Sequence, residues 1–322
     1  MNDIITNLEN KTIFTSRLAF ARSLLALNAL LTIVFNDIDM ITDTRLLGLQ
    51  SAIPADMLLF NSINIFKVTG NDWGKVISIA ILLFAFSGYF PRISIFLQAW
   101  VHLSICNSLI VIEGGDQIAS NLCLLLIPIC LFDKRTNQWI NYTKEQLSHL
   151  KNRNIFFNVY YFLILLQVSV IYLHAGTGKL MQDDWLDGTC MYYWTTNNVF
   201  GAPLFLQEIY NIITLSIFAP VFTWSIIFFE LGLFACILSS SKRTRHFFLA
   251  GGILFHFGIF ITHGLIEFFF ASSAALILYL DSENIILTRL ISAKDQFKRL
   301  LKKTFINSKQ IKGQAVTSRT NT

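Results

Sequence analysis

The stretch IFFNVYYFLILLQVSVIYLHAGTGKLMQDDW, residues 155–185, decides what kind of fold this chain adopts. It opens with an apolar run of the length that spans a bilayer, about 20 residues. The run passes without a spacer into a lysine, Lys179, and then into a tryptophan among acidic residues, Trp185. An ammonium group at the end of a membrane helix either reaches the lipid headgroups or is held inside the protein for chemistry.

The composition extends this conclusion to the whole chain. Apolar residues make up 54% of the 322 residues, charged residues only 14%, and phenylalanine occurs 30 times. A soluble globular protein carries roughly 25% charged residues. The apolar runs do not alternate with polar residues, as the strands of a membrane barrel would. The sequence therefore predicts an all-α, polytopic transmembrane helical bundle in the cell membrane.

We expect about eight spans, within a range of about seven to nine. They are residues 18–35, 76–90, 93–112, 117–132, 155–177, 211–238, 246–262 and 265–280. Pro220 lies inside the sixth span and either kinks it or marks its true start. The connection 36–75 mixes apolar and polar residues, which predicts a re-entrant or interfacial helix.

Lysine and arginine favour one set of connections between these spans. That set includes residues 11–22, 133–153 and 242–245, and it continues into a basic tail. The opposite connections hold only Arg45, Lys67, Lys75 and Lys179. Because positive residues accumulate on the cytoplasmic side, both ends of the chain are predicted to be cytoplasmic.

The chain divides in this prediction into a transmembrane domain, residues 1–280, and a basic cytoplasmic tail, residues 281–322. The tail starts as an amphipathic basic helix and ends in a Ser/Thr/Asn-rich stretch that we expect to be partly disordered. Its charge predicts contact with the anionic lipids of the bilayer. No folded nucleic-acid reader accompanies it, so nucleic acid is not an expected partner.

Polar residues gather at the predicted outer face. Glu113 and Asp116 flank a Gly-Gly pair, which is either a tight turn capped by Asp116 or a place where a substrate approaches a carboxylate. Lys179 follows four small residues, 175–178, that permit close helix approach or an open mouth. The lysine either snorkels or serves as a base or oxyanion partner. We predict that Lys179 and Asp116 line one pocket that opens outward, with Trp185 as a belt aromatic or a pocket residue.

Three ionisable side chains lie deep in predicted spans: His102, Glu230 and His256. A carboxylate in hydrocarbon needs a polar partner, and His256 on the next span is the nearest candidate at matching depth. We expect one cluster, with His102 as a third member. It is either a structural hydrogen-bonded group or a proton relay or substrate pocket.

No motif in the sequence requires a metal or a cofactor. CxxC and HExxH spacings are absent, as are phosphate-binding glycine loops and the GxSxG nucleophile motif. Of five cysteines only Cys190 falls in a predicted outer loop, where a free thiol is expected.

The block YLHAGTGKLMQDDWLDG, residues 172–188, resembles the strongest motif of the vitamin K-dependent gamma-carboxylase superfamily. That superfamily includes the bacterial horizontally transferred transmembrane (HTTM) domains. The Gly-Gly-Asp turn, the opening ARSLL at 21–25 and the late His256 also resemble its bacterial members. The length, without a lumenal domain, is most similar to the sporulation-delaying protein B family, which works with a small partner to mature a secreted antimicrobial peptide toxin.

The resemblance implies that Lys179 stands where the carboxylase has the lysine that deprotonates reduced vitamin K. Asp116 replaces the histidine of an Asn-Asn-His element of that enzyme, a departure from the carboxylase pattern. The candidate catalytic residues are therefore Lys179, Asp116 and Glu113. The candidate substrate-binding or relay residues are His102, His174, Trp185, Glu230 and His256.

Three functions are compatible with these observations. The first is a membrane factor for maturation of an exported peptide toxin, or bacteriocin, with a small membrane-associated protein of the same operon and the secreted precursor as partners. The second is a gamma-carboxylase-like enzyme that uses a reduced quinone as cofactor. The third is a non-enzymatic scaffold, immunity or transport subunit. Whether the chain is an enzyme stays open at this point.

Overall fold

The computed structural model describes Glu9, the ranges 12–42, 62–109, 113–148 and 151–281, and three isolated residues after them. Within these residues the regular structure is helical, apart from one isolated bridge between Tyr89 and Asn137. The longer helices are α2 (Ser16–Phe35), α6 (Asn71–Phe86), α7 (Pro91–Cys106), α8 (Gly114–Leu131), α10 (Lys151–Lys179), α14 (Ala219–Ala235), α15 (Lys242–His263) and α16 (Ile266–Leu280). The shorter ones are α3 (Ile38–Thr42), α5 (Ile65–Thr69), α9 (Lys144–Ser148), α11 (Asp183–Leu186), α12 (Cys190–Thr196), α13 (Leu204–Thr214) and the 3₁₀ turn η3 (Cys236–Leu238).

Five helices in the described residues are long and apolar enough to cross a membrane. They are α2, α8, most of α10, α14 with the turn that follows it, and α15. The protein is therefore an all-helical, multi-pass membrane protein. The helix α16 is apolar but shorter, and α6 and α7 have 16 residues each. Each predicted span overlaps a helix, while the count of eight crossings stays a prediction.

The predicted span 211–238 is wrong at its start. The chain leaves the helical path after Thr214 and re-enters it at Ala219, so α13 and α14 are separate helices. Pro220 stands in the first turn of α14, where its missing N–H leaves no helical hydrogen bond unmade. The proline therefore marks the true start of the span.

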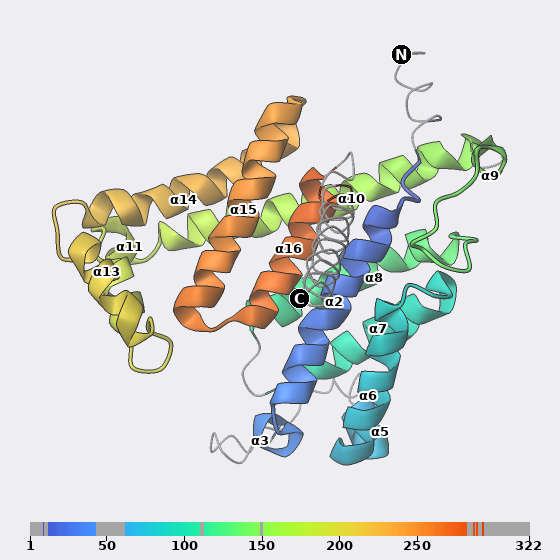
Figure 1. Ribbon diagram of the computed structural model, residues 1–322, viewed down its shortest axis with the longest axis horizontal. Helices are drawn as coiled ribbons and strands as arrows, with labels where there is room; N and C mark the ends of the chain where they lie inside the picture. Colours follow the sequence, from blue (N-terminus) through green and yellow to red (C-terminus); the bar gives the residue numbers. More distant parts are fainter. Residues whose placement is uncertain are drawn as a thin grey trace, which may run out of the picture. The chain divides into compact units, whose positions relative to one another are not determined.

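The helix α16 is central to the bundle because residues 271–280 are all buried. It packs against α2, α8, α10 and α15 (Figure 1). A run of small residues, ASSAA at 271–275, lets neighbouring backbones approach closely. Apart from Ser272 and Ser273, the buried stretch of α16 is mostly apolar, as expected for a helix surrounded by other helices.

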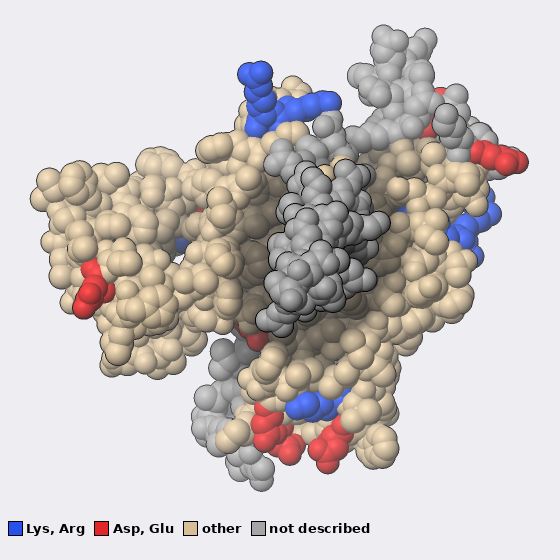
Figure 2. All heavy atoms as spheres, in the orientation of Figure 1, with Lys and Arg blue, Asp and Glu red and all other residues tan. Residues whose placement is uncertain are grey.

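Arginine side chains tie several helix ends together. Arg17 Nη1 donates to the backbone oxygen of Asp281 at 2.9 Å, which joins the start of α2 to the end of α16. Arg245 of α15 donates to the backbone oxygen of Tyr279 in α16. Arg92 of α7 donates to the backbone oxygen of Asp133, just after α8. In Figure 2 the charged side chains lie toward the margins of the drawn face. The side of the membrane on which these arginines lie stays a prediction.

Arg22 is fully buried in α2 and bound by neutral groups. Its Nε donates to Gln98 Oε1 at 3.2 Å, Nη1 to Gln138 Oε1 at 2.8 Å and Nη2 to Ser94 Oγ at 2.9 Å. Gln138 in turn donates to Asp133 Oδ2 at 3.0 Å. The guanidinium thus joins α2, α7 and the loop after α8.

Two predicted features fall largely outside the described residues. The middle of the predicted interfacial segment 36–75 is one, since only its two sides, residues 36–42 with α3 and residues 62–75 with α5 and the start of α6, are described. The predicted tail 281–322 is the other, and only isolated residues of it are described. The chain separates into two compact units, Met1–Asp281 and Ser282–Thr322.

Candidate functional site

Lys179, the last residue of α10, forms a buried ion pair with Glu230 of α14. Its Nζ lies 2.7 Å from Glu230 Oε2 and 2.9 Å from Oε1. The lysine side chain is 20% exposed and the glutamate side chain 8%. The lysine also folds back toward the backbone oxygen of Ala175, one turn earlier, at 3.4 Å. Lys179 is therefore held inside the protein by a carboxylate.

A glycine makes this pairing possible. A Cβ atom on Gly176 would lie 2.8 Å from Leu231 Cδ2, so a larger residue would require Leu231 to move, and glycine favours the close approach of α10 and α14. Gly176 lies one turn before Lys179 on α10, and Leu231 directly follows Glu230 on α14. The contact between Gly176 and Leu231 therefore brings Lys179 and Glu230 close together. The small residues in the lysine block thus act through helix packing.

An aromatic ring covers the other side of the ammonium group. Lys179 Nζ lies 5.1 Å from the ring centroid of Trp185, which belongs to the short helix α11. An ammonium group at this distance from an indole is attracted by the π electrons, by about 0.5–2 kcal/mol. Trp185 and Glu230 therefore both contact the ammonium group of Lys179.

The ion pair forms part of the wall of a cavity of about 750 Å³. Such a volume falls within the range of about 300–1,000 Å³ that is usual for ligand pockets. Most of the other lining side chains are apolar or aromatic; among them are Trp185, Trp194, Phe222, Ile226, Leu254 and Phe268. The cavity therefore suits an apolar ligand with a polar group directed at Lys179.

Glu113, immediately before α8, lines the same cavity. Burial, then the charges of Asp116 and Glu267, raise the pKa of its carboxyl group to about 8. Its Oε1 atom is buried and has no hydrogen-bond partner among the described residues. Glu113 therefore carries a proton at neutral pH and can donate it to a ligand.

Asp116 is buried, with 3% of its surface exposed, and is not among the residues that line the cavity. The predicted pocket of Lys179 and Asp116 is thus formed by Lys179 and Glu113 instead. The Gly-Gly turn explains this placement. A Cβ on Gly115 would lie 2.8 Å from Phe268 Cα, so the start of α8 packs directly on α16 and turns Asp116 into the protein.

The three deep residues do not form the predicted cluster. Glu230 binds Lys179, and the expectation of His256 as its partner is wrong. His256 Nδ1 contacts the backbone oxygen of Gly252 at 2.8 Å, and its ring packs against Tyr172, Phe255 and Phe268. Since both phenylalanines line the cavity, His256 lies behind its wall.

The other two candidate histidines, His102 and His174, are not at the site, whereas His263, which the sequence analysis did not single out, lines the cavity. His102 is buried on α7, and its Nε2 has no hydrogen-bond partner among the described residues. His174 is exposed on α10 and is not a lining residue of the cavity. Cys190 is a buried free thiol at the start of α12. Neither His102 nor His174 lines the lysine's cavity in this structure.

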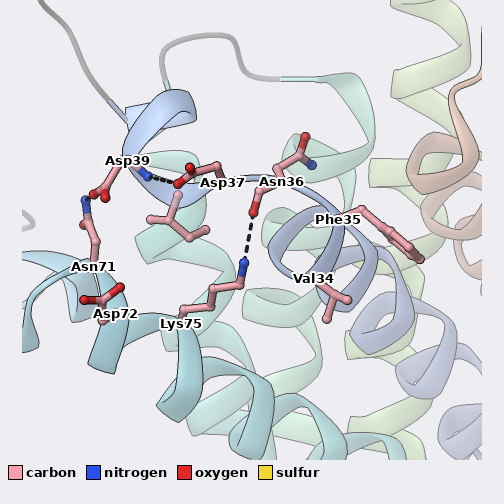
Figure 3. Close-up of a pocket in the computed structure, with 9 residues that line it drawn as sticks. Val34, Phe35, Asn36, Asp37, Asp39, Asn71, Asp72 and Lys75 are labelled. Carbon is pink, nitrogen blue, oxygen red and sulfur yellow. Dashed lines mark hydrogen bonds between the residues drawn. The ribbon is translucent and has the colours of Figure 1, made fainter.

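A second, polar cavity of about 420 Å³ lies between the end of α2 and the start of α6 (Figure 3). Its polar groups bind one another: Lys75 Nζ donates to the backbone oxygen of Asn36 at 3.1 Å, and Asp37 caps α3. Asn71 donates to Asp39 across the same cavity. No group of three or more His, Cys, Asp or Glu in the described ranges could hold a metal ion.

Because the polar groups of the smaller cavity bind one another, we take the larger cavity as the candidate site.

Two curated relatives match nearly the whole chain. The sporulation-delaying protein SdpB of Bacillus subtilis (strain 168) is 31% identical over 304 residues, which is 92% of this chain and 91% of that protein. An uncharacterized protein of the same organism, YitO, is 32% identical over 281 residues, with 86% and 88% covered. Neither a protein-family model nor a solved structure matches the chain.

Proposed function

Since the chain belongs to the family of the sporulation-delaying protein SdpB, we propose that it is a membrane factor for maturation of a secreted antimicrobial peptide of the sporulation-delaying type. Its partners in this proposal are the exported precursor and a small membrane-associated protein. The match over nearly the full length of both chains supports this assignment.

The Lys179–Glu230 pair on the wall of an apolar cavity carries the proposal. A buried ion pair is weak evidence for stability, because desolvation of the two charges offsets their attraction. Its place beside an open volume points to chemistry instead. If Glu230 takes the lysine proton when a ligand displaces water, the neutral amine becomes a base. Glu113 is protonated and can serve as the acid in the same cavity.

A second function, a carboxylase-like enzyme with a reduced quinone, is favoured by one observation. The lysine that the resemblance matches to the catalytic lysine lines an apolar cavity large enough for a quinone ring. Asp116 in place of the carboxylase histidine argues against it. The non-enzymatic alternatives, a scaffold, immunity or transport subunit, do not require Lys179 at all.

We also propose that all eight longer helices cross the membrane and that both ends of the chain are cytoplasmic. The arginines that join helix ends at one side of the bundle support this orientation. Cysteines introduced in 133–143 and 197–203 should react with an impermeant maleimide from opposite sides. Labelling of both loops from outside would contradict the orientation.

The experiment that tests the function compares substitutions of Lys179. Lys179→Ala should abolish maturation of the precursor, with the protein still present in the membrane. Lys179→Arg should also fail, because a guanidinium keeps its proton at working pH. Lys75→Arg is the matched control, since Lys75 lies near the other cavity, and it should leave maturation unchanged. Full activity of Lys179→Arg would reduce the lysine to a charge anchor.

A further inference from the structure

The helices α14 and α15 pack against each other from the turn that joins them as far as Phe229 and Phe255, whose ring centroids lie 5.6 Å apart. A Cβ on Gly232 of α14 would lie 2.7 Å from the Phe248 ring, and a Cβ on Gly251 of α15 would lie 3.1 Å from Phe229. The rings of Phe229 and Phe248 also stack, with centroids 5.6 Å apart. Two glycines and two phenylalanines therefore lock this end of the helix pair.

Away from the turn the two helices diverge (Figure 1), and the cavity lies where they do. Gly258 of α15 lines the cavity, and a Cβ atom on it would meet no atom within 4 Å, which indicates open space beside it. Leu254, one turn earlier, also lines the cavity and is 68% exposed. Phe222 and Ile226 line it from α14. The cavity therefore reaches the side of the bundle between α14 and α15, at Leu254.

This opening lies at mid-membrane depth. Both helices are among those long and apolar enough to cross the bilayer. Leu254 lies about 18 Å along α15 from Lys242 and about 14 Å from His263, at about 1.5 Å per residue. An opening in the middle of a spanning helix faces acyl chains and not headgroups or water.

We propose that the cavity is filled from the bilayer, through the gap between α14 and α15, by a single-chain amphiphile whose oxygen-bearing head binds Lys179. The apolar wall takes the chain. The charged and carboxyl side chains of its lining, Lys179, Glu230 and Glu113, take the head. This inference uses the same cavity as the proposed function and does not depend on peptide maturation.

The position of the opening excludes other occupants by this route. A two-chain phospholipid would have to draw a permanently charged headgroup through the acyl region, at a cost of several kcal/mol per charge, whereas a fatty acid can enter with its carboxyl group protonated. An extended peptide would bring backbone N–H and C=O groups into hydrocarbon without partners. A precursor peptide therefore meets the site from the outer surface, while the amphiphile arrives from the side.

The test uses the full-length protein in lipid nanodiscs with palmitic acid that carries a diazirine at mid-chain. After illumination, labelled residues are located by mass spectrometry. We expect label on cavity residues, in particular Ile226, Leu254 and Met191, and we expect unlabelled palmitate to compete for those positions. Labelling of the lipid-facing Phe96 on α7 should not respond to competitor, because bulk lipid contact is not saturable.

Gly258→Phe is the critical variant, because the structure has open space at that position and the ring would fill the mouth of the cavity. It should reduce label on cavity residues at least about tenfold and leave label on Phe96 unchanged. The matched control is Phe257→Leu, next to Gly258 and outside the cavity lining. It should label as the wild type does.

Two results would overturn the inference. One is cavity labelling that persists in a folded Gly258→Phe protein, which would mean entry by another route. The other is a cavity that stays unlabelled while Phe96 is labelled, which would mean that no bilayer amphiphile occupies it. Maturation assays on the same variants distinguish failure of this inference from failure of the proposed function. Either labelling result could occur while Lys179 is still required for maturation.

Discussion

Arg22 and Lys179 are both cations held inside the bundle, and their surroundings are opposite in kind. Arg22 is completely buried and gives hydrogen bonds to Gln98, Gln138 and Ser94, none of which is charged. Lys179 is partly exposed, binds the carboxylate of Glu230 and borders a cavity. The difference separates a cation that holds helices together from one that is placed to react.

The chemistry of the two side chains fits this division. A guanidinium stays charged at any working pH and spreads its donors over a planar fork, so it can join three helices or loops at once. An ammonium group is compact and can lose its proton to a neighbouring carboxylate. Arg22 lines neither of the two cavities described above, whereas Lys179 lines the one of about 750 Å³.

The largest effect that this comparison predicts is on stability at the Arg22 site. Arg22→Met should lower the free energy of unfolding by about 4 kcal/mol, because three buried acceptors lose their donor at about 1–3 kcal/mol each and some re-pair. Arg22→Lys should recover only part of this, since one ammonium cannot reach all three. Thermal unfolding in detergent measures both.

The matched change at the other site is Lys179→Met, which should cost less stability than Arg22→Met. Equal losses of unfolding temperature in the two variants would break the division between a structural and a reactive cation. Maturation should show the reverse order: it should be absent in Lys179→Met and reduced in Arg22→Lys only as far as the amount of folded protein falls.

An intermediate effect is expected from removing the ion pair as a whole. Lys179→Met alone leaves the buried Glu230 carboxylate without its cation, at about 1–3 kcal/mol because the cavity allows protonation or water. The double variant Lys179→Met/Glu230→Leu should return to within about 1 kcal/mol of the wild type, since an apolar pair can replace a buried ion pair. Unfolding of the four proteins forms a double-mutant cycle.

Maturation assays on the same four proteins show whether the ion pair serves the function or only the fold. Stability restored with maturation still absent indicates that the pair is kept for function. Maturation that returns with stability would show that the pair only supports the fold, and the proposed chemistry would fail.

Sequence reasoning identified the helical membrane class and the lysine block because both are local signals. Long apolar runs need no partner to be recognised, and Lys179 follows its own helix directly. The partner of Glu230 was missed because it depends on how α10 and α14 cross, which Gly176 sets by packing on Leu231. Depth along a helix ranked His256 first, but it does not say which way a side chain points.

The same limit explains the two remaining differences. The break between α13 and α14 could be suspected from Pro220, but its position follows from tertiary contacts such as the hydrogen bond between Tyr210 and Thr262. Glu113 and Asp116 are three residues apart, and only the close packing of Gly115 on Phe268 decides which of them faces the cavity. Short-range sequence cannot distinguish them.

The last effect that the comparison predicts is a pH dependence at the lysine site. Burial raises the pKa of Glu113 from 4.5 to about 8, so between these values the folded state holds a proton that the unfolded state has lost. Stability from this group is therefore complete below about pH 4.5 and falls as the pH rises to about 8. The Glu113→Gln side chain cannot titrate, so this variant should not show that pH-dependent loss of stability.

Unfolding temperatures between about pH 5 and pH 9 test this directly. The Glu113→Gln protein should gain on the wild type as the pH rises, and the gain should level off above about pH 8. Arg22→Met, by contrast, should run parallel to the wild type over the same range, because neither methionine nor the side chains bound to Arg22 titrate there. A constant offset between Glu113→Gln and the wild type would mean that the carboxyl is already ionised at neutral pH. Glu113 could then not donate a proton to a ligand, and Lys179 would face the cavity without an acid beside it.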